Sequence, residues 1–343
     1  MTSCATLLAA LGGESGCKRL SAEFYARVAT DPVLHHLFPG KTLKCATEEF
    51  AAFLIQFLGG DEARSQRRWW LSLRESHARF RIGPAERLAW LKNMDATLDA
   101  SALDDGTRMA LRRFFRESSS YVSNDGSLVR NEDVEHVELV TRWSEQRLLD
   151  DVIAAIASAR DEEAIASAPR FQSRPSVYVG LLARMVRTGR AGLIGFVHQA
   201  LELDGYLITR RFAGRTLLHY AAAAGRPEIV TALLRLGTDP NVGDGGGHTP
   251  LYSVANECDS PAGGAIVRAL VEAGADVNAC GVSRVTALHM AARRDNVEIA
   301  RALLDCGAVM EARDAKGATP LQRAVNCRQR NVARFLQERA DEN

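Results

Sequence analysis

Four related segments follow one another in the C-terminal half of the chain, and this repetition restricts the fold more than any other feature of the sequence. They begin at Gly214, Gly247, Val285 and Gly317, and the threonines near their starts lie 33, 37 and 33 residues apart. The longer step contains the loop ECDSPAGG, at residues 257–264. Repeats of this length form solenoids, in which each unit buries its apolar face against its neighbours. The sequence therefore predicts a stacked array.

The start of each segment resembles the ankyrin repeat, a turn followed by two antiparallel helices. The segments open with TLLH, TPLY, TALH and TPLQ. In this pattern threonine caps a helix, and Pro250 or Pro320 takes the first helical position, where its missing N–H costs nothing. His219 and His289 lie where the family uses histidine for hydrogen bonds between neighbouring repeats, and we assign them no chemistry. Glycines supply the left-handed backbone that ends the helices, at Gly225, Gly237, Gly274 and Gly307.

The array extends upstream of these four segments. A helix, a glycine and a second helix are indicated from Leu181 onwards without the threonine-led start, which is typical of a degenerate terminal repeat. We therefore assign residues 177–343 to ankyrin repeats, the first of them degenerate. Residues 124–176 form a connector that is mostly helical, with breaks predicted at 124–126 and 173–176.

Residues 1–123 lack this period and instead indicate separate amphipathic helices. One apolar face is formed by Leu20, Phe24 and Val28, and a second by Phe50, Phe53, Leu54 and Phe57. The dipeptides at residues 31–32 and 59–60 end these two helices. Gly83-Pro84 starts another, whose apolar side we expect to carry Leu88, Trp90, Leu91, Met94 and Leu98, and residues 104–123 form the last.

Four stretches of this N-terminal part form a further pattern: FYARVATDPVLHHLFP, FLIQFLGG, LRESHARFRI and ERLAWLKNM, in this order between residues 24 and 94. Together they resemble the truncated haemoglobins. The tryptophan of the last stretch resembles the second group of that family, and the similarity covers roughly residues 5–122. The resemblance implies an all-α fold, in which a truncated globin of two-over-two helical form, residues 1–123, precedes the connector and the solenoid.

The resemblance also implies a haem b cofactor and assigns its ligands. His77 corresponds to the proximal histidine that binds the haem iron and is the one metal ligand that we assign. Tyr25 and Trp90 correspond to distal residues, whose O–H and N–H groups can donate hydrogen bonds to bound dioxygen. Ala46 stands where larger globins usually carry a distal histidine, so this role falls to Tyr25 and Trp90.

Other positions of the family pattern concern the walls of the pocket. Phe38 matches the aromatic residue that packs on the haem face, where many second-group members have tyrosine, and Phe50 matches an apolar lining position. Arg74 is close to His77 in the sequence and is a candidate partner for a haem propionate, the alternative being a surface arginine. Trp69 and Trp70 stand where the family often has a turn that contains glycine. His35 and His36 are adjacent and therefore face different directions, as expected for solvated residues.

Composition excludes several other classes of protein. The formal net charge is +1 with both signs interspersed, so no basic field favours nucleic acid. Seven cysteines without a C-x-x-C pair argue against a disulfide framework and a zinc site, and are typical of a reducing compartment. The first residues lack a secretory leader, and the most apolar stretch is shorter than the roughly 20 residues that span a bilayer. We therefore expect a cytoplasmic protein without a membrane segment.

Three functions remain open from the sequence. The first is a haem module that binds O2, or NO or CO, for oxygen binding or transport or for gas or redox sensing, and is coupled to an ankyrin surface for an unknown protein partner. The second is a haem enzyme, a nitric oxide dioxygenase or a peroxidase, although we assign no catalytic residue. The third is a scaffold without haem. The first is preferred, because an oxygen store has no need of a docking surface.

Overall fold

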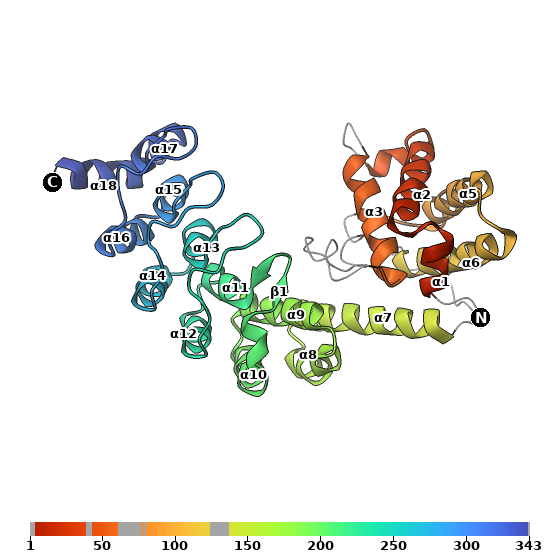
Figure 1. Ribbon diagram of the computed structural model, residues 1–343, viewed down its shortest axis with the longest axis horizontal. Helices are drawn as coiled ribbons and strands as arrows, with labels where there is room; N and C mark the ends of the chain where they lie inside the picture. Colours follow the sequence, from red (N-terminus) through yellow and green to blue (C-terminus); the bar gives the residue numbers. More distant parts are fainter. Residues whose placement is uncertain (1–3, 39–42, 61–76, 78–79, 124–136, 342–343) are drawn as a thin grey trace. The chain divides into compact units, whose positions relative to one another are not determined.

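The computed structural model describes residues 4–38, 43–60, 77, 80–123 and 137–341 (Figure 1). It divides into two compact units, residues 1–153 and 154–343, and the division falls within helix α7 (Val137–Ala157). The three segments proposed from the sequence, with borders at 123/124 and 176/177, stay a prediction. None of the helices in the described ranges is both long enough and apolar enough to cross a membrane.

The N-terminal unit is helical, as the sequence predicts. Helix α2 packs against α3 and α5, α5 packs against α6, and the short α1 lies beside α2 (Figure 1). The helices are α1 (Cys4–Ala10), α2 (Gly13–Val28), the 3₁₀ turn η1 (His35–Leu37), α3 (Lys44–Phe57), α5 (Pro84–Ala100), α6 (Asp105–Val122) and the first part of α7.

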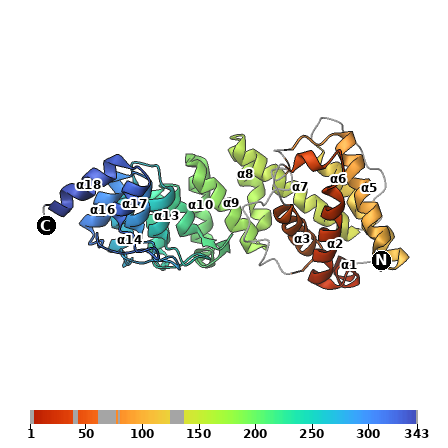
Figure 2. The same cartoon turned by 90° about the horizontal axis from the view of Figure 1, so that it is seen from above.

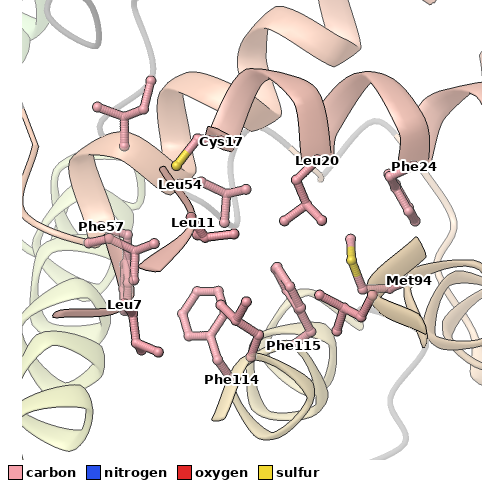
Figure 3. Close-up of a cluster of buried hydrophobic side chains, with 14 of the residues drawn as sticks. Leu7, Leu11, Cys17, Leu20, Phe24, Leu54, Phe57, Met94, Phe114 and Phe115 are labelled. Carbon is pink, nitrogen blue, oxygen red and sulfur yellow. The ribbon is translucent and has the colours of Figure 1, made fainter. Parts of the chain in front are cut away.

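The core of this unit combines aliphatic and aromatic side chains. Phe24 of α2 and the neighbouring Phe114 and Phe115 of α6 are all buried. Figure 3 shows Phe115 between Phe114 and Met94, below Leu20. The predicted apolar faces of α2 and α3 are confirmed, with Phe50 and Phe53 half-buried and the other residues of both sets buried.

One predicted core position on α5 is wrong. Leu88 is 64% exposed, whereas Met94, Thr97 and Leu98 of the same helix are buried. Leu88 lies nine residues before Thr97, and at 3.6 residues per turn this spacing places it on the opposite side of the helix. The buried face of α5 therefore includes a threonine, whose hydroxyl donates to the carbonyl oxygen of Asn93 at 2.8 Å, and excludes a leucine.

The C-terminal unit consists of helix pairs stacked in two rows. First helices pack on first helices, from α9 through α11, α13 and α15 to α17, and second helices pack on second helices, from α10 through α12, α14 and α16 to α18. Figure 2 views these pairs from above. The helices are α8 (Asp161–Ser167), η3 (Ala168–Phe171), α9 (Pro175–Thr188), α10 (Ala191–Leu203), η4 (Gly205–Ile208), α11 (Leu217–Ala223), α12 (Pro227–Arg235), α13 (Pro250–Glu257), α14 (Gly263–Glu272), α15 (Ala287–Arg293), α16 (Val297–Asp305), α17 (Pro320–Asn326) and α18 (Arg330–Asp341).

The local signals of the repeats act as predicted with one exception, Thr216, which stands at the N-cap of α11 without a side-chain cap hydrogen bond. Thr249, Thr286 and Thr319 cap their helices through the side-chain oxygen, and Pro250 and Pro320 occupy the first turn. The four predicted glycines have φ between 67° and 96°. A two-stranded antiparallel hairpin, β1 (Arg211–Phe212) and β2 (Arg215–Thr216), precedes α11. The degenerate segment forms the pair α9 and α10, with Gly189 between them at φ 71°.

Two buried histidines join neighbouring repeats. The backbone N–H of Thr216 donates to Nδ1 of His219 at 3.3 Å, so Nε2 carries the proton and donates to the carbonyl oxygen of His248 at 3.0 Å. His289 makes the same pair of contacts, with Thr286 and with the carbonyl oxygen of Ala318. Each imidazole is therefore fixed in its neutral form, and burial lowers the pKa of His219 from 6.5 to about 4.

The stability of the repeats should consequently fall in mild acid. Between pH 6.5 and about 4 the unfolded chain takes up a proton on residue 219 that the folded chain refuses, so the free energy of unfolding decreases as the pH falls through this range. The loss from this residue reaches about 3 kcal/mol near pH 4. Urea unfolding followed by circular dichroism at a series of pH values measures it.

The variant His219→Gln keeps an N–H for the carbonyl oxygen of His248 but does not titrate, so its pH dependence should be weaker than that of the unmodified chain. His36→Ala, which removes an exposed histidine, is the matched control and should leave the pH dependence unchanged. Equal slopes for His219→Gln and the unmodified chain would contradict the assignment.

Candidate functional site

Four side chains that the sequence singles out lie together in the N-terminal unit. The ring of Tyr25, on α2, lies 5.7 Å from that of Phe38 and 6.1 Å from that of Phe50, with both pairs edge to face. Phe50, on α3, lies 6.0 Å from Trp90, on α5. Phe24 contacts Tyr25 and Trp90 from the core side, at 5.1 and 5.0 Å. Three helices and the segment after η1 therefore contribute to one aromatic cluster, which we call the aromatic pocket wall: Tyr25, Phe38, Phe50 and Trp90.

Two polar groups of this wall have no hydrogen-bond partner among the described residues. They are the hydroxyl of Tyr25 and the indole N–H of Trp90, and both side chains are half-buried. Burial raises the pKa of the Tyr25 phenol well above its usual range, so this group remains a neutral donor. Each donor lies among aromatic rings, which offer it no strong acceptor. The arrangement therefore suits a ligand that accepts hydrogen bonds.

His77 belongs to a different segment of the chain, which contacts the wall through Phe80. Its backbone is helical, its side chain is half-buried, and its carbonyl oxygen accepts from the N–H of Phe80 at 3.0 Å. The ring of Phe80 lies 5.7 Å from that of Phe38. The turn that carries His77 is thus joined to the aromatic pocket wall through Phe80. Within the described residues, no group of three or more histidine, cysteine or acidic side chains could hold a metal ion.

The remaining candidate residues lie on α3, on η1 or outside the described residues. Ala46 is half-buried on α3, and because Phe50 follows it by four residues, the two share one face of that helix. Arg74, Trp69 and Trp70 lie outside the described residues. His35 and His36 are exposed, as expected.

Side-chain hydrogen bonds hold the helices of the wall in place. The amide of Asn93, three residues after Trp90, donates to a carboxylate oxygen of Asp31 at 2.7 Å, and the other oxygen of Asp31 accepts from two backbone N–H groups of the following turn. The hydroxyl of Ser21 on α2 donates to the carbonyl oxygen of Thr47 on α3 at 2.6 Å. At the start of α5, the N–H of Gly83 donates to the carboxylate of Glu86 at 2.8 Å. The first of these contacts joins α5 to the turn after α2, the second joins α2 to α3, and the third caps the start of α5.

Two residues near the wall were not identified from the sequence. Phe80 connects the histidine turn to Phe38, and Phe115 lies 5.6 Å from Trp90 and 6.0 Å from Phe50. The spacing of three residues between His77 and Phe80 was the available signal for the first. In the sequence, Phe115 is only one of two adjacent phenylalanines on an amphipathic helix. Tertiary packing decides which of the two contacts the wall.

Comparison with known proteins relates each unit to a family. A family model described as bacterial-like globin matches residues 6–124, and one described as ankyrin repeats (3 copies) matches residues 191–280 and 261–343. The two families therefore match different units of the structure.

Individual proteins are similar to one part of this chain each. Group 2 truncated hemoglobin 3-1 of Lotus japonicus is 31% identical over 106 residues, which are 30% of this chain and 63% of the plant protein. Ankyrin repeat and SOCS box protein 16 of Homo sapiens is 35% identical over 155 residues, 42% of this chain and 32% of the human protein. The chain thus spans less than two thirds of either relative. This chain is also similar to the hemoglobin of Chloroflexus aurantiacus, of which a crystal structure exists, with 39% sequence identity. The match covers 34% of this chain and 97% of the hemoglobin chain, and the two structures superpose with a TM-score of 0.33.

Proposed function

Because this chain joins a bacterial-like globin domain to ankyrin repeats, we propose that it binds a diatomic gas at a haem b in its N-terminal unit and a protein partner through its repeats. A globin domain implies a haem cofactor and gas binding, and ankyrin repeats imply protein interaction. The identity of the gas and a role in sensing go beyond what the two families imply, and they belong to the proposal. The observation that carries it is the aromatic pocket wall, which holds two hydrogen-bond donors that no other described residue accepts from.

The residues present fit a haem. Aromatic rings from three helices and the η1 segment provide a largely apolar surface for a flat macrocycle, and a half-buried imidazole lies on the neighbouring turn. The O–H of Tyr25 and the N–H of Trp90 supply the hydrogen-bond donors that a gas ligand accepts from. The sequence has no Cys-x-x-Cys-His motif, which favours haem b held without thioether bonds.

Each residue then has a defined task. A haem bound here would supply an iron that can coordinate a diatomic gas. His77 would hold the iron through a ring nitrogen, and Phe38 would pack against the macrocycle. Tyr25 and Trp90 would donate hydrogen bonds to the gas, while Ala46 and Phe50 would exclude water from its surroundings. Arg74 remains a candidate partner for a propionate.

The repeats favour sensing over storage. A protein that only stores oxygen needs no second surface, whereas a sensor needs one that contacts its target. Turnover of nitric oxide is the alternative function, and it requires an external electron donor. Rapid mixing of the dioxygen-loaded chain with nitric oxide distinguishes the two, because an enzyme continues to consume nitric oxide when a donor is present and a carrier reacts once.

A visible absorption spectrum tests the proposal directly. The purified full-length chain, titrated with hemin, should develop the Soret band of a protein-bound haem at a ratio of one haem per chain. Reduction and addition of CO should then shift this band. A chain that leaves hemin in its free form at equimolar concentration would exclude the gas-binding function and leave a haem-free scaffold.

A further inference from the structure

A side chain from beyond the globin match completes the core of the globin unit. Helix α7 begins at Val137, after the last residue that the globin family model matches. Its Trp143 is only 4% exposed. The indole ring lies 4.7 Å from the ring of Phe57 on α3, and it stacks on Phe114 of α6 at 6.0 Å with 29° between the ring planes. The globin core therefore extends into the connector.

Three ring contacts lead from Trp143 to the aromatic pocket wall. Phe114 contacts Phe115 at 5.0 Å, and Phe115 contacts Trp90 at 5.6 Å and Phe50 at 6.0 Å. Figure 3 shows Phe114 and Phe115 next to each other in the centre of the core. Both are buried, with exposed fractions of 0% and 1%. In a close-packed protein core, a displacement of one ring is transmitted to the next, because no free space absorbs it.

Building on the proposed function, we propose that Trp143 is a positioning residue of the gas pocket. Its ring supports Phe114 and Phe115, and these hold the indole of Trp90 and the ring of Phe50 at the wall. The coupling is reciprocal by linkage: if the packing of Trp143 changes how tightly a gas is held, then binding of that gas changes how tightly α7 is packed. The connector helix therefore responds to the content of the pocket.

The test compares variants of the full-length chain loaded with haem. Trp143→Leu removes the aromatic support, Trp143→Phe keeps a smaller aromatic ring, and Ser144→Ala alters the exposed neighbouring residue as the matched control. Dioxygen dissociation is measured after rapid mixing. We expect Trp143→Leu to change the rate by about 3-fold or more, Trp143→Phe to change it less, and Ser144→Ala to leave it unchanged. Coupling through packed side chains is typically of this size.

A second measurement needs no variant. Amide hydrogen exchange of residues 137–157 is followed in the unmodified chain with reduced haem, in the absence and presence of CO, and should differ between the two states. In Trp143→Leu this difference should shrink. Urea unfolding of the haem-free variants reports separately on how much Trp143 stabilises the fold.

The outcomes separate this inference from the proposed function. The chain could bind haem and CO while amide exchange of α7 is the same with and without CO and Trp143→Leu releases dioxygen at the normal rate. This result would retain the proposed function and overturn the positioning role of Trp143. Loss of stability alone would then show that Trp143 only fills the core. If Trp143→Leu does not fold, the exchange comparison on the unmodified chain decides. Failure to bind haem would overturn both proposals.

Discussion

Replacing His77 with alanine should reduce the affinity for hemin by more than about 100-fold, because even residues that only support a metal ligand contribute 10- to 100-fold to metal affinity. We assign the iron one protein ligand, so no second side chain compensates for its loss. The apolar contacts of the aromatic pocket wall remain and still attract the macrocycle weakly. A titration of the haem-free chain with hemin, followed at the Soret band, measures the change.

Two further variants make the result specific to the bond between the imidazole and the iron. His36→Ala removes an exposed histidine on η1 and should bind hemin normally. His77→Gly leaves space where the imidazole was, and added imidazole should restore the spectrum. An unchanged hemin affinity in His77→Ala would show that another residue binds the iron.

The second large effect concerns how long dioxygen stays in the pocket. Tyr25→Phe removes one hydroxyl and leaves the ring contacts with Phe24, Phe38 and Phe50 in place. A hydrogen bond to a group that carries charge is worth about 1.5–3 kcal/mol, which corresponds to a dissociation rate roughly 10- to 150-fold faster. Trp90→Leu should act in the same direction. Release of CO should change much less, because CO is the poorer hydrogen-bond acceptor.

Stopped-flow displacement of dioxygen by CO measures these rates. Tyr206→Phe, which alters an exposed tyrosine of the repeats, is the matched control and should release dioxygen at the normal rate. The double variant of Tyr25 and Trp90 shows whether the two donors act on the same ligand, since shared partners make their effects non-additive. If neither single variant changes dioxygen release, the two groups are not the donors.

Sequence reasoning predicted what local chemistry determines. Threonine caps, first-turn prolines and glycines with positive φ placed the helices of the repeats correctly, because each signal acts within a few residues. The members of the aromatic pocket wall were identified from a family resemblance, and the structure places Tyr25, Phe38, Phe50 and Trp90 together. Their roles at a haem stay a prediction.

What the sequence did not predict depends on contacts between distant segments. The orientation of α5 is set by its neighbours α2 and α6, and apolarity alone wrongly placed Leu88 in the core. Trp143 is separated from Phe57 by 86 positions, and nothing near it in the sequence indicates that it enters the core of the N-terminal unit. Amphipathic periodicity shows that a helix has a buried side but not which partner covers it.

The hydroxyl of Tyr25 and the indole N–H of Trp90 have a consequence for how this protein responds to selection. Neither group bonds to another described residue, so its replacement costs no hydrogen bond within that part of the protein, and heat resistance and ligand retention make different demands on the same two side chains. A library screened for thermal survival alone would enrich phenylalanine at position 25 and aliphatic residues at position 90. The variants selected in this way would be more heat-resistant and would bind the gas less tightly.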